Sequence, residues 1–141
     1  MILLDTDHLS VHAFPESERY ESLSAKIRLS TREFGTTIVC IEEQLRGWLA
    51  AIKRKQDVND QVHVYDQLTK LWGHFGGWKI LRFSEQAADL FKTFRKQKIR
   101  IGSQDLKIAA IAITQDALLL SANMRDFRAV PGLRVENWLE T

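Results

Sequence analysis

Acidic residues stand at the ends of short apolar segments in this 141-residue chain. They are Asp5, the pair Glu42 and Glu43, Asp105 and Asp126. Two carboxylates about 4 Å apart repel by about 4 kcal/mol at an effective dielectric of 20, so several in one place need a cation between them. Mg²⁺ and Mn²⁺ prefer carboxylate oxygens and water, and such a site can activate a water and neutralise a phosphodiester. The residue types therefore predict metal-assisted phosphodiester chemistry.

Taken one at a time, the same acids have ordinary structural explanations. Asp5 could be the N-cap of a following helix. Asp105 and the two glutamates fall in the first turn of predicted helices, where a negative charge gains about 0.3–1 kcal/mol from the helix dipole. Asp126 has Arg125 and Arg128 as neighbours, and a surface ion pair contributes about 0–1 kcal/mol. It is their convergence at one place that would indicate a functional site.

The elements that would bring these acids together alternate between strand and helix. Short apolar segments predict strands at 2–4, 36–39, 79–82, 118–120 and 134–135. Helical patterns cover 17–30, 41–55, 57–72, 84–97 and 104–114. We predict an α/β fold with a central parallel sheet of four to five short strands and helices on both faces. Ligands of such sheets bind beyond the carboxyl ends of the strands, so the acids that follow strands would meet there, and Asp105 joins them if its helix starts at that edge.

Length and composition favour one soluble domain. The chain is 45% hydrophobic and 27% charged, which is typical of globular proteins and excludes a disordered chain. A net charge of +2 permits a polyanionic partner without requiring one. The single cysteine, Cys40, excludes an internal disulfide and fits a reducing compartment. No apolar segment is long enough to cross a membrane and no signal peptide is recognisable, so we expect a cytoplasmic protein without a membrane partner.

The acidic segments also occur in an order that is typical of one protein family. They are Leu3–Ser10, Ile41–Gly47, Ile101–Ala110 and Leu120–Phe127, followed by the ending Val130–Trp138. Together they resemble the motifs of PIN-domain endoribonucleases, specifically the VapC-type toxins of bacterial toxin–antitoxin pairs. The resemblance extends over essentially the whole chain and implies a single PIN domain over residues 1–141.

The resemblance implies a metal-dependent endoribonuclease. Its metal ligands and catalytic residues would be Asp5, Glu43, Asp105 and Asp126, holding Mg²⁺ or Mn²⁺. A water activated by the metal would attack the phosphorus in line and leave a 5′-phosphate and a 3′-hydroxyl. Three positions depart from the family pattern. Asp7 stands where Asn is commoner and adds a fifth acid, while Cys40 and Ser121 stand where Thr is usual.

Helical periodicity and the resemblance disagree about the second acid. The apolar stripe of the predicted helix 41–55 leaves Glu42 at its flank and Glu43 nearly opposite, so periodicity places Glu42 nearer the core. In the family motif an acid precedes a glycine by four positions, which selects Glu43 before Gly47. We take Glu43 as the site residue and keep Glu42 as its alternative.

Polar and basic neighbours of the acids are candidates for supporting roles. Those that could orient the carboxylates or a water are Thr6, Ser121 and Asn123. Those that could contact RNA are Arg95, Lys96, Lys98 and Arg100, directly before the Asp105 segment. RNA binding is largely electrostatic, but a basic cluster is also typical of a solvated helix end. The four histidines show no paired metal-ligand spacing, and we interpret them as structural.

The resemblance further implies protein partners. A VapB-type antitoxin would bind an apolar groove formed by the amphipathic segments 17–30 and 57–72 and block the acidic site. A homodimer is also typical of the family.

Two other functions compete with the nuclease. The sequence Asp5-Thr6-Asp7 after an apolar strand is similar to the DxD of haloacid-dehalogenase-like phosphatases, in which the first Asp is a nucleophile. That assignment leaves Glu43 without a role, and short motifs often match by accident. The second alternative is a non-catalytic PIN-like module that binds RNA or protein. The presence of all four acids argues against it.

Overall fold

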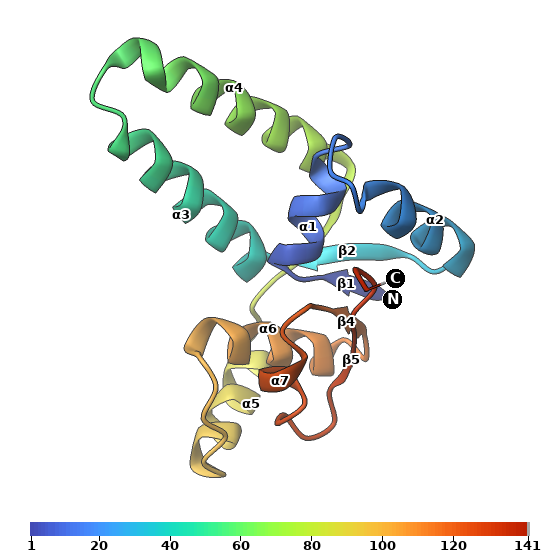
Figure 1. Cartoon of the computed structure of the whole chain (residues 1–141). Helices are drawn as coiled ribbons and strands as arrows, with labels where there is room; N and C mark the ends of the chain where they lie inside the picture. The colour runs from blue at the N-terminus through green and yellow to red at the C-terminus, as the bar shows by residue number, and fades with distance from the viewer. Residues whose placement is uncertain (141) are drawn as a thin grey trace.

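The computed structural model describes residues 1–140 and contains one five-stranded sheet. Its strands are β1 (Ile2–Leu4), β2 (Phe34–Thr37), β3 (Lys79–Leu81), β4 (Leu118–Leu120) and β5 (Arg134–Glu136). Their order is β3-β2-β1-β4-β5, and all neighbouring pairs are parallel. The predicted parallel α/β sheet is confirmed, and β1, which Asp5 directly follows, is its central strand (Figure 1).

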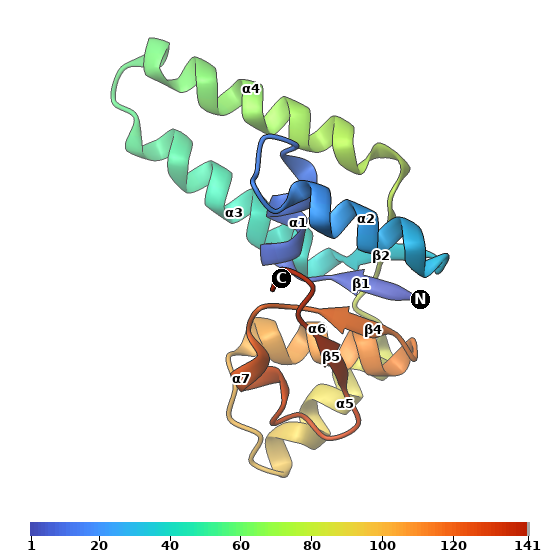
Figure 2. The same ribbon diagram turned by 45° about the vertical axis from the view of Figure 1, so that its right-hand side comes forward.

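Helices cover both faces of the sheet, as predicted. They are α1 (Thr6–Ala13), α2 (Tyr20–Ser30), α3 (Ile38–Arg54), α4 (Val58–His74), α5 (Glu85–Lys96), α6 (Ser103–Thr114) and α7 (Met124–Phe127), with a 3₁₀ turn η1 (Phe75–Gly77) after α4. α1 and α2 lie on one side of the sheet and α5 and α6 on the other (Figures 1 and 2). α3 and α4 form a long hairpin that extends away from the sheet.

The short strands are stable because they run through the middle of the core. All three side chains of β1, Ile2, Leu3 and Leu4, are 0% exposed. In β4, Leu119 and Leu120 are also 0% exposed. α6 packs against this strand and is itself buried, which explains why its sequence is apolar on nearly every side. Burying one such side chain contributes about 1.5–3 kcal/mol. The carboxyl ends of β1 and β4 are therefore rigidly placed side by side.

The boundary between β2 and α3 differs from the prediction. The sequence predicts a strand over 36–39, but β2 ends at Thr37 and α3 begins at Ile38. The Thr37 hydroxyl accepts a hydrogen bond from the Cys40 N–H (3.1 Å) and caps the helix. This cap outweighs the strand propensity of the β-branched residues that follow. The earlier start places no acid in the first turn of α3, so the helix-dipole explanation of the two glutamates is wrong.

The α3–α4 hairpin leaves much of its apolar surface uncovered. Leu49 of α3 is 59% exposed and Trp72 of α4 is 68% exposed. Val58, Val62 and Tyr65 of α4 are also more than half exposed. No helix within residues 1–140 is long and apolar enough to cross a membrane.

Candidate active site

Asp5 follows β1 and is held at the carboxyl edge of the sheet. Its N–H donates to the Leu120 carbonyl (2.9 Å), which extends the pairing of β1 with β4. Its Oδ1 accepts from the Thr6 N–H (2.8 Å), so Asp5 is the N-cap of α1. Its Oδ2 accepts from the Ser121 hydroxyl (2.7 Å). The capping role that the sequence suggested is therefore present, and it fixes the carboxylate beside the end of β4.

Burial makes Asp5 hard to ionise. The residue is 6% exposed, and this burial, followed by the negative charge of Asp7, raises its pKa to about 7. The Cys40 thiol lies 3.7 Å from Asp5 Oδ1. Burial raises the pKa of this thiol to about 12, so it stays protonated and can donate to the carboxylate. Cys40 thus supplies a donor where the family resemblance places a hydroxyl.

Glu43 faces the same acidic edge from α3. Its Oε2 accepts from the Thr6 hydroxyl (3.0 Å). Its Oε1 is buried and has no hydrogen-bond partner within residues 1–140. Burial, followed by hydrogen-bond and charge effects that include the negative charge of Asp105, leaves the pKa of Glu43 above its usual value. An unpartnered buried carboxylate oxygen is unfavourable unless a cation or water approaches it.

Glu42 turns away from this edge. Its carboxylate pairs with Arg46 (2.6 Å) at the surface and accepts from the Gln104 amide (2.8 Å). These contacts lower its pKa. The periodicity that placed Glu42 nearer the core is wrong, because the apolar stripe of α3 faces α4 in the hairpin while the opposite flank of its first turns faces α1.

Asp105 and Asp126 are joined by one amide. The Asn123 Nδ2 group donates to Asp105 Oδ2 (3.0 Å) and to Asp126 Oδ2 (3.2 Å), and its two hydrogens allow both bonds at once. Asp105 lies in the first turn of α6, so this helix does start at the carboxyl edge. Burial and then the charge of Asp126 raise the pKa of Asp105. Through its own charge Asp105 also raises the pKa of Asp5 and of Glu43.

No family model matches the chain, but curated proteins do. "Ribonuclease VapC1" of Rickettsia felis is 39% identical over 61 residues, which cover 43% of this chain and 42% of that protein. "Ribonuclease VapC2" of the same organism is 25% identical over 142 aligned positions, with 96% of both chains covered. "Ribonuclease VapC2" of Haemophilus influenzae is 34% identical over 84 residues, or 60% of this chain and 54% of that protein. In the first and third comparisons the chain therefore spans only about half of the relative.

Solved structures match the fold over almost the whole chain. VapBC2 of Rickettsia felis, bound to a promoter DNA fragment, has a TM-score of 0.72 at 22% identity and covers 98% of this chain and 99% of that chain. DNA-bound VapBC of Salmonella typhimurium has a TM-score of 0.74 at 19% identity and covers 97% of each. FitAcB of Neisseria gonorrhoeae has a TM-score of 0.72 at 22% identity and covers 100% of each. At these identities the solved structures show a similar fold only. The similarity in sequence comes from the curated relatives.

The chain resembles VapC-type PIN-domain proteins in sequence and in fold.

The acidic edge offers the oxygen ligands that a hard divalent cation binds. All four predicted site acids offer oxygen, which Mg²⁺ and Mn²⁺ prefer. The unpartnered Glu43 Oε1 and the raised pKa values of Asp5, Glu43 and Asp105 are what an acidic cluster shows when its charges are not yet compensated. Among residues 1–140, no three Asp, Glu, His or Cys side chains by themselves form a group that could hold an ion. The residue types therefore fit such a cation, with part of its coordination left to water.

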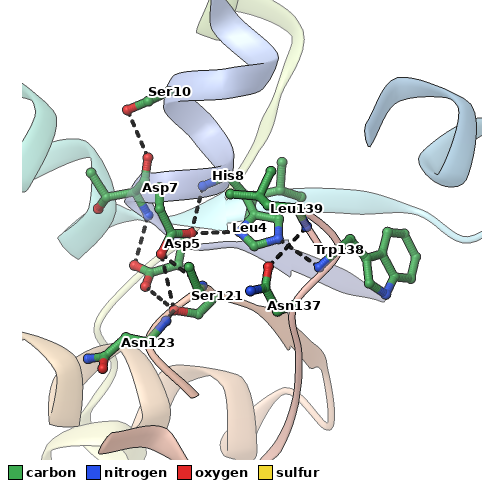
Figure 3. A network of polar contacts seen from close by, with 12 residues as sticks. Leu4, Asp5, Asp7, His8, Ser10, Ser121, Asn123, Asn137, Trp138 and Leu139 are labelled. Atoms are coloured by element: carbon green, nitrogen blue, oxygen red, sulfur yellow. Dashed lines mark hydrogen bonds and ion pairs between the residues drawn. The ribbon is translucent and has the colours of Figure 1, made fainter. Parts of the chain in front are cut away.

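The supporting residues predicted from the sequence contact the acids directly. Thr6 donates to Glu43, Ser121 donates to Asp5, and the Asn123 amide bridges the other two acids. Figure 3 shows Ser121 and Asn123 beside Asp5. Ser121 also accepts from the Asn123 N–H (3.0 Å), which ties the two together.

Behind these residues lies a second layer formed by Asp7, which the sequence offered as a fifth acid, and His8, whose contact with it sequence reasoning missed. The Asp7 carboxylate accepts from the Ala122 N–H (2.9 Å) and lies 2.6 Å from the His8 ring (Figure 3). His8 is 0% exposed. The available signal was the replacement of the commoner Asn by an acid directly before a histidine.

The basic residues before α6 divide into two kinds. Arg95 is occupied within the protein, because it donates to the Ile99 carbonyl (2.7 Å) and lies 5.1 Å from the centre of the Phe91 ring. Lys96, Lys98 and Arg100 are exposed. Of the predicted RNA-contact residues, these three offer charges on the surface.

Proposed function

We propose that this protein is a divalent-metal-dependent endoribonuclease, the toxin of a VapBC-type pair, formed by a single PIN domain over residues 1–141. The observation that carries the proposal is the unpartnered, buried Glu43 Oε1 within a cluster of carboxylates whose pKa values are raised. A buried oxygen of this kind is energetically favourable only when it ligates a cation or a water. The names of the curated relatives supply the substrate class, RNA. As a ribonuclease acting on RNA inside the cell, this protein would be cytoplasmic.

The four site acids would together bind the metal ion at this edge. Mg²⁺ or Mn²⁺ would be held by Asp5, Glu43, Asp105 and Asp126, partly through water. When bound, the metal supplies positive charge next to the scissile phosphate and makes water a better nucleophile. The chain's own residues keep the acids in place, because Thr6, Ser121 and Asn123 each donate to one or two of the carboxylates. Lys96, Lys98 and Arg100 would attract the RNA backbone.

An antitoxin of the VapB type would bind the exposed apolar side chains of the hairpin. Tyr65, Leu68 and Trp72 of α4 line a hollow of about 410 Å³, and its other wall is Leu45 of α3 rather than the predicted segment 17–30. A second hollow of about 310 Å³ extends from Trp48 to Glu43 and leads to the acidic edge. The first hollow lies on the α4 side of α3 and the second on its α1 side, so an antitoxin helix with apolar anchors would fit the first and a separate polar segment the second. The solved neighbours include VapBC complexes, and we extend that assembly, and a homodimer, to this chain.

A phosphatase that uses Asp5 as a nucleophile fits the site poorly. Both carboxylate oxygens of Asp5 accept hydrogen bonds, and the residue is 6% exposed. A nucleophile must be free to reach the phosphorus, and the donors around Asp5 reduce its reactivity.

The decisive experiment is the cleavage of end-labelled total RNA by the purified protein, separated from any antitoxin. Reactions contain Mg²⁺, Mn²⁺ or EDTA. We expect discrete fragments with either metal and none with EDTA. Asp5→Asn and Glu43→Gln should each lower the rate more than about a hundredfold, since outer-shell partners alone are worth about 10- to 100-fold.

The matched control is Asp116→Asn. Asp116 is an exposed acid at the other end of β4, where it pairs with Arg134, and Asn tolerates its positive φ of 49°. This variant should cleave like the wild type. Equal cleavage by wild type and Asp5→Asn would indicate a contaminating ribonuclease, and no cleavage by the folded, antitoxin-free wild type would contradict the proposal.

A thermal-shift measurement gives a readout without RNA. Mn²⁺ that binds only the folded state stabilises it by about 2.7 kcal/mol at a hundred times its Kd. The melting temperature of the wild type should therefore rise with Mn²⁺, and that of Asp5→Asn should rise much less.

A further inference from the structure

The tautomer of His8 is determined by its two partners. His8 Nε2 lies 3.1 Å from the backbone N–H of Trp138, which can only donate. Nε2 must therefore carry the lone pair, and the ring proton sits on Nδ1. Nδ1 lies 2.6 Å from Asp7 Oδ1, so it donates to that oxygen. Figure 3 shows the ring between Asp7 and the segment that contains Trp138.

Each close partner of the Asp7 carboxylate is a donor. Oδ1 accepts from the His8 ring and also from the His8 N–H (2.7 Å). Oδ2 accepts from the Ala122 N–H (2.9 Å), with the Ser121 hydroxyl at 3.4 Å. An asparagine at position 7 would have one acceptor oxygen and one NH₂ group. Either the His8 donors or the Ala122 N–H would then face the NH₂ group, which is itself a donor. His8 cannot adjust, because the other tautomer would bring Nε2–H against the Trp138 N–H.

The Ala122 N–H, which donates to Asp7, belongs to the segment that supports the site acids. Ala122 stands between Ser121, which donates to Asp5, and Asn123, whose amide joins Asp105 to Asp126. A shift of the Ala122 backbone would displace both supporting side chains at once.

We propose that Asp7 and His8 form a positioning pair that anchors Ser121–Asn123, and through them the site acids, to the folded segment at Trp138. This inference rests on the nuclease proposed above. It explains why the chain has Asp at position 7, where an Asn would conflict with His8. Neither residue needs to touch the substrate, so the pair acts on turnover through the groups it orients.

The competing explanation is that His8 only fastens the C-terminal segment. That segment has a second anchor, since Lys26 Nζ donates to the carbonyls of Trp138 and Glu140 (3.1 Å each). Two substitutions separate the roles. In His8→Asn the amide nitrogen can occupy the place of Nδ1 and keep the bond to Asp7. In His8→Gln the amide oxygen can occupy the place of Nε2 and keep the bond to Trp138.

The test compares kcat and KM of the two variants on the RNA fragment that the wild type cleaves. We expect His8→Asn to keep kcat within about threefold, and His8→Gln to lose about 10- to 100-fold in kcat, as for other residues that orient metal-site ligands. KM should change little in either, because the exposed basic residues are untouched. Equal losses in both variants, or a larger loss in His8→Asn, would overturn the proposal.

A double variant checks that the two residues act as a unit. Asp7→Asn alone places a donor against a donor and should lower kcat. In Asp7→Asn with His8→Asn, the second amide can turn its oxygen toward the first and restore a matched pair. We expect the double variant to be more active than Asp7→Asn alone, which is a non-additive result. Additive losses would contradict the pairing.

An NMR measurement decides the hydrogen bonding without any activity. Long-range ¹H–¹⁵N correlation of the histidine ring in the wild type should show His8 protonated at Nδ1 and bare at Nε2. In Asp7→Asn the amide resonance of Ala122 should shift. If the protein cleaves no RNA but shows this tautomer, the proposed nuclease function is contradicted and the positioning pair is not. The opposite tautomer would overturn the positioning pair whatever the activity.

Discussion

Two clusters of titratable side chains border α1, one of carboxylates at its start and one of imidazoles at its end. Burial pushes both toward the neutral form. It raises the pKa of Asp5 to about 7 and lowers the pKa of His12 to about 4. In both cases desolvation is the largest cause, followed by a neighbour of like kind, Asp7 for Asp5 and His74 for His12.

The clusters differ in whether their polar atoms find partners. His12 Nδ1 lies 3.3 Å from His74 Nε2, within hydrogen-bond distance. Aromatic rings surround the pair, with those of Phe34 and Trp78 at 5.8 and 5.2 Å from His12. The imidazoles are thus neutral and paired. The carboxylates leave Glu43 Oε1 unpartnered and keep several like charges in one place.

The comparison teaches that a shifted pKa does not by itself identify a functional site. The same physical cause acts on both clusters. What sets the acidic edge apart is uncompensated polarity, which only a further group, such as a cation, can satisfy.

The largest effect on stability should come from replacing Asp5, the site acid that burial makes hardest to ionise. In the folded state the pKa of Asp5 is about 7, above its ordinary value of 3.8, so the native state holds this proton more tightly than the unfolded state. The resulting stability is present below pH 4 and lost as pH rises through 7. Asp5→Asn, which keeps the N-cap, avoids this loss. It should be more stable than the wild type by about 4 kcal/mol at pH 8 and about equally stable at pH 4.

The measurement is urea unfolding of both proteins from pH 4 to 8 with EDTA present. Asp116→Asn serves as the control and should follow the wild type. A stability difference that does not grow with pH would show that the Asp5 carboxylate is not strained by burial. Combined with a loss of activity, the expected result would mean that the site is maintained at the expense of stability.

The imidazole cluster should respond to pH in the opposite direction. The pKa of His12 is lowered to about 4 from an ordinary value of 6.5, so the native state binds its proton less readily. The stability that depends on neutral His12 is present above pH 6.5 and lost as pH falls toward 4. His12→Phe should reduce that acid sensitivity by about 1 kcal/mol, since water screens the partly exposed ring.

His12→Phe should also retain RNA cleavage within about twofold, because its cluster touches none of the site acids. Urea unfolding at pH 4.5 and 7.5 and the cleavage assay test both statements. A strong loss of activity at unchanged stability would mean that the two clusters are coupled through α1, and the contrast between them would fail.

The smallest effect on cleavage and on stability should come from replacing Glu42. Its carboxylate is exposed, and Arg46 and Gln104 already partner it. Glu42→Gln should change cleavage by less than about twofold and leave the melting temperature nearly unchanged, since surface pairs of this kind contribute little. A large loss of cleavage would return Glu42 to the site as the alternative to Glu43.

Sequence reasoning succeeded where one segment carried enough information by itself. The apolar triplets at 2–4 and 118–120 predicted buried strands with Asp5 directly after the first, and both strands are present. It failed at the start and in the first turns of α3. The Thr37 cap moved the start of α3 back into a β-branched segment. Helical periodicity placed Glu42 nearer the core, whereas Glu43, which the family resemblance selected, faces the acidic edge.

The sequence by itself therefore determined the alternation of strands and helices and the set of acids available at their ends, because apolar runs and side-chain chemistry are local properties. The tertiary structure decided which acids meet. Asn123 can join Asp105 to Asp126 only where α6 and α7 start at one edge, and Asp7 can hold Ala122 only because β1 and β4 are neighbours. The Asp7–Ala122 contact joins residues 115 positions apart, and the donors and acceptors of the site are matched only in the folded chain.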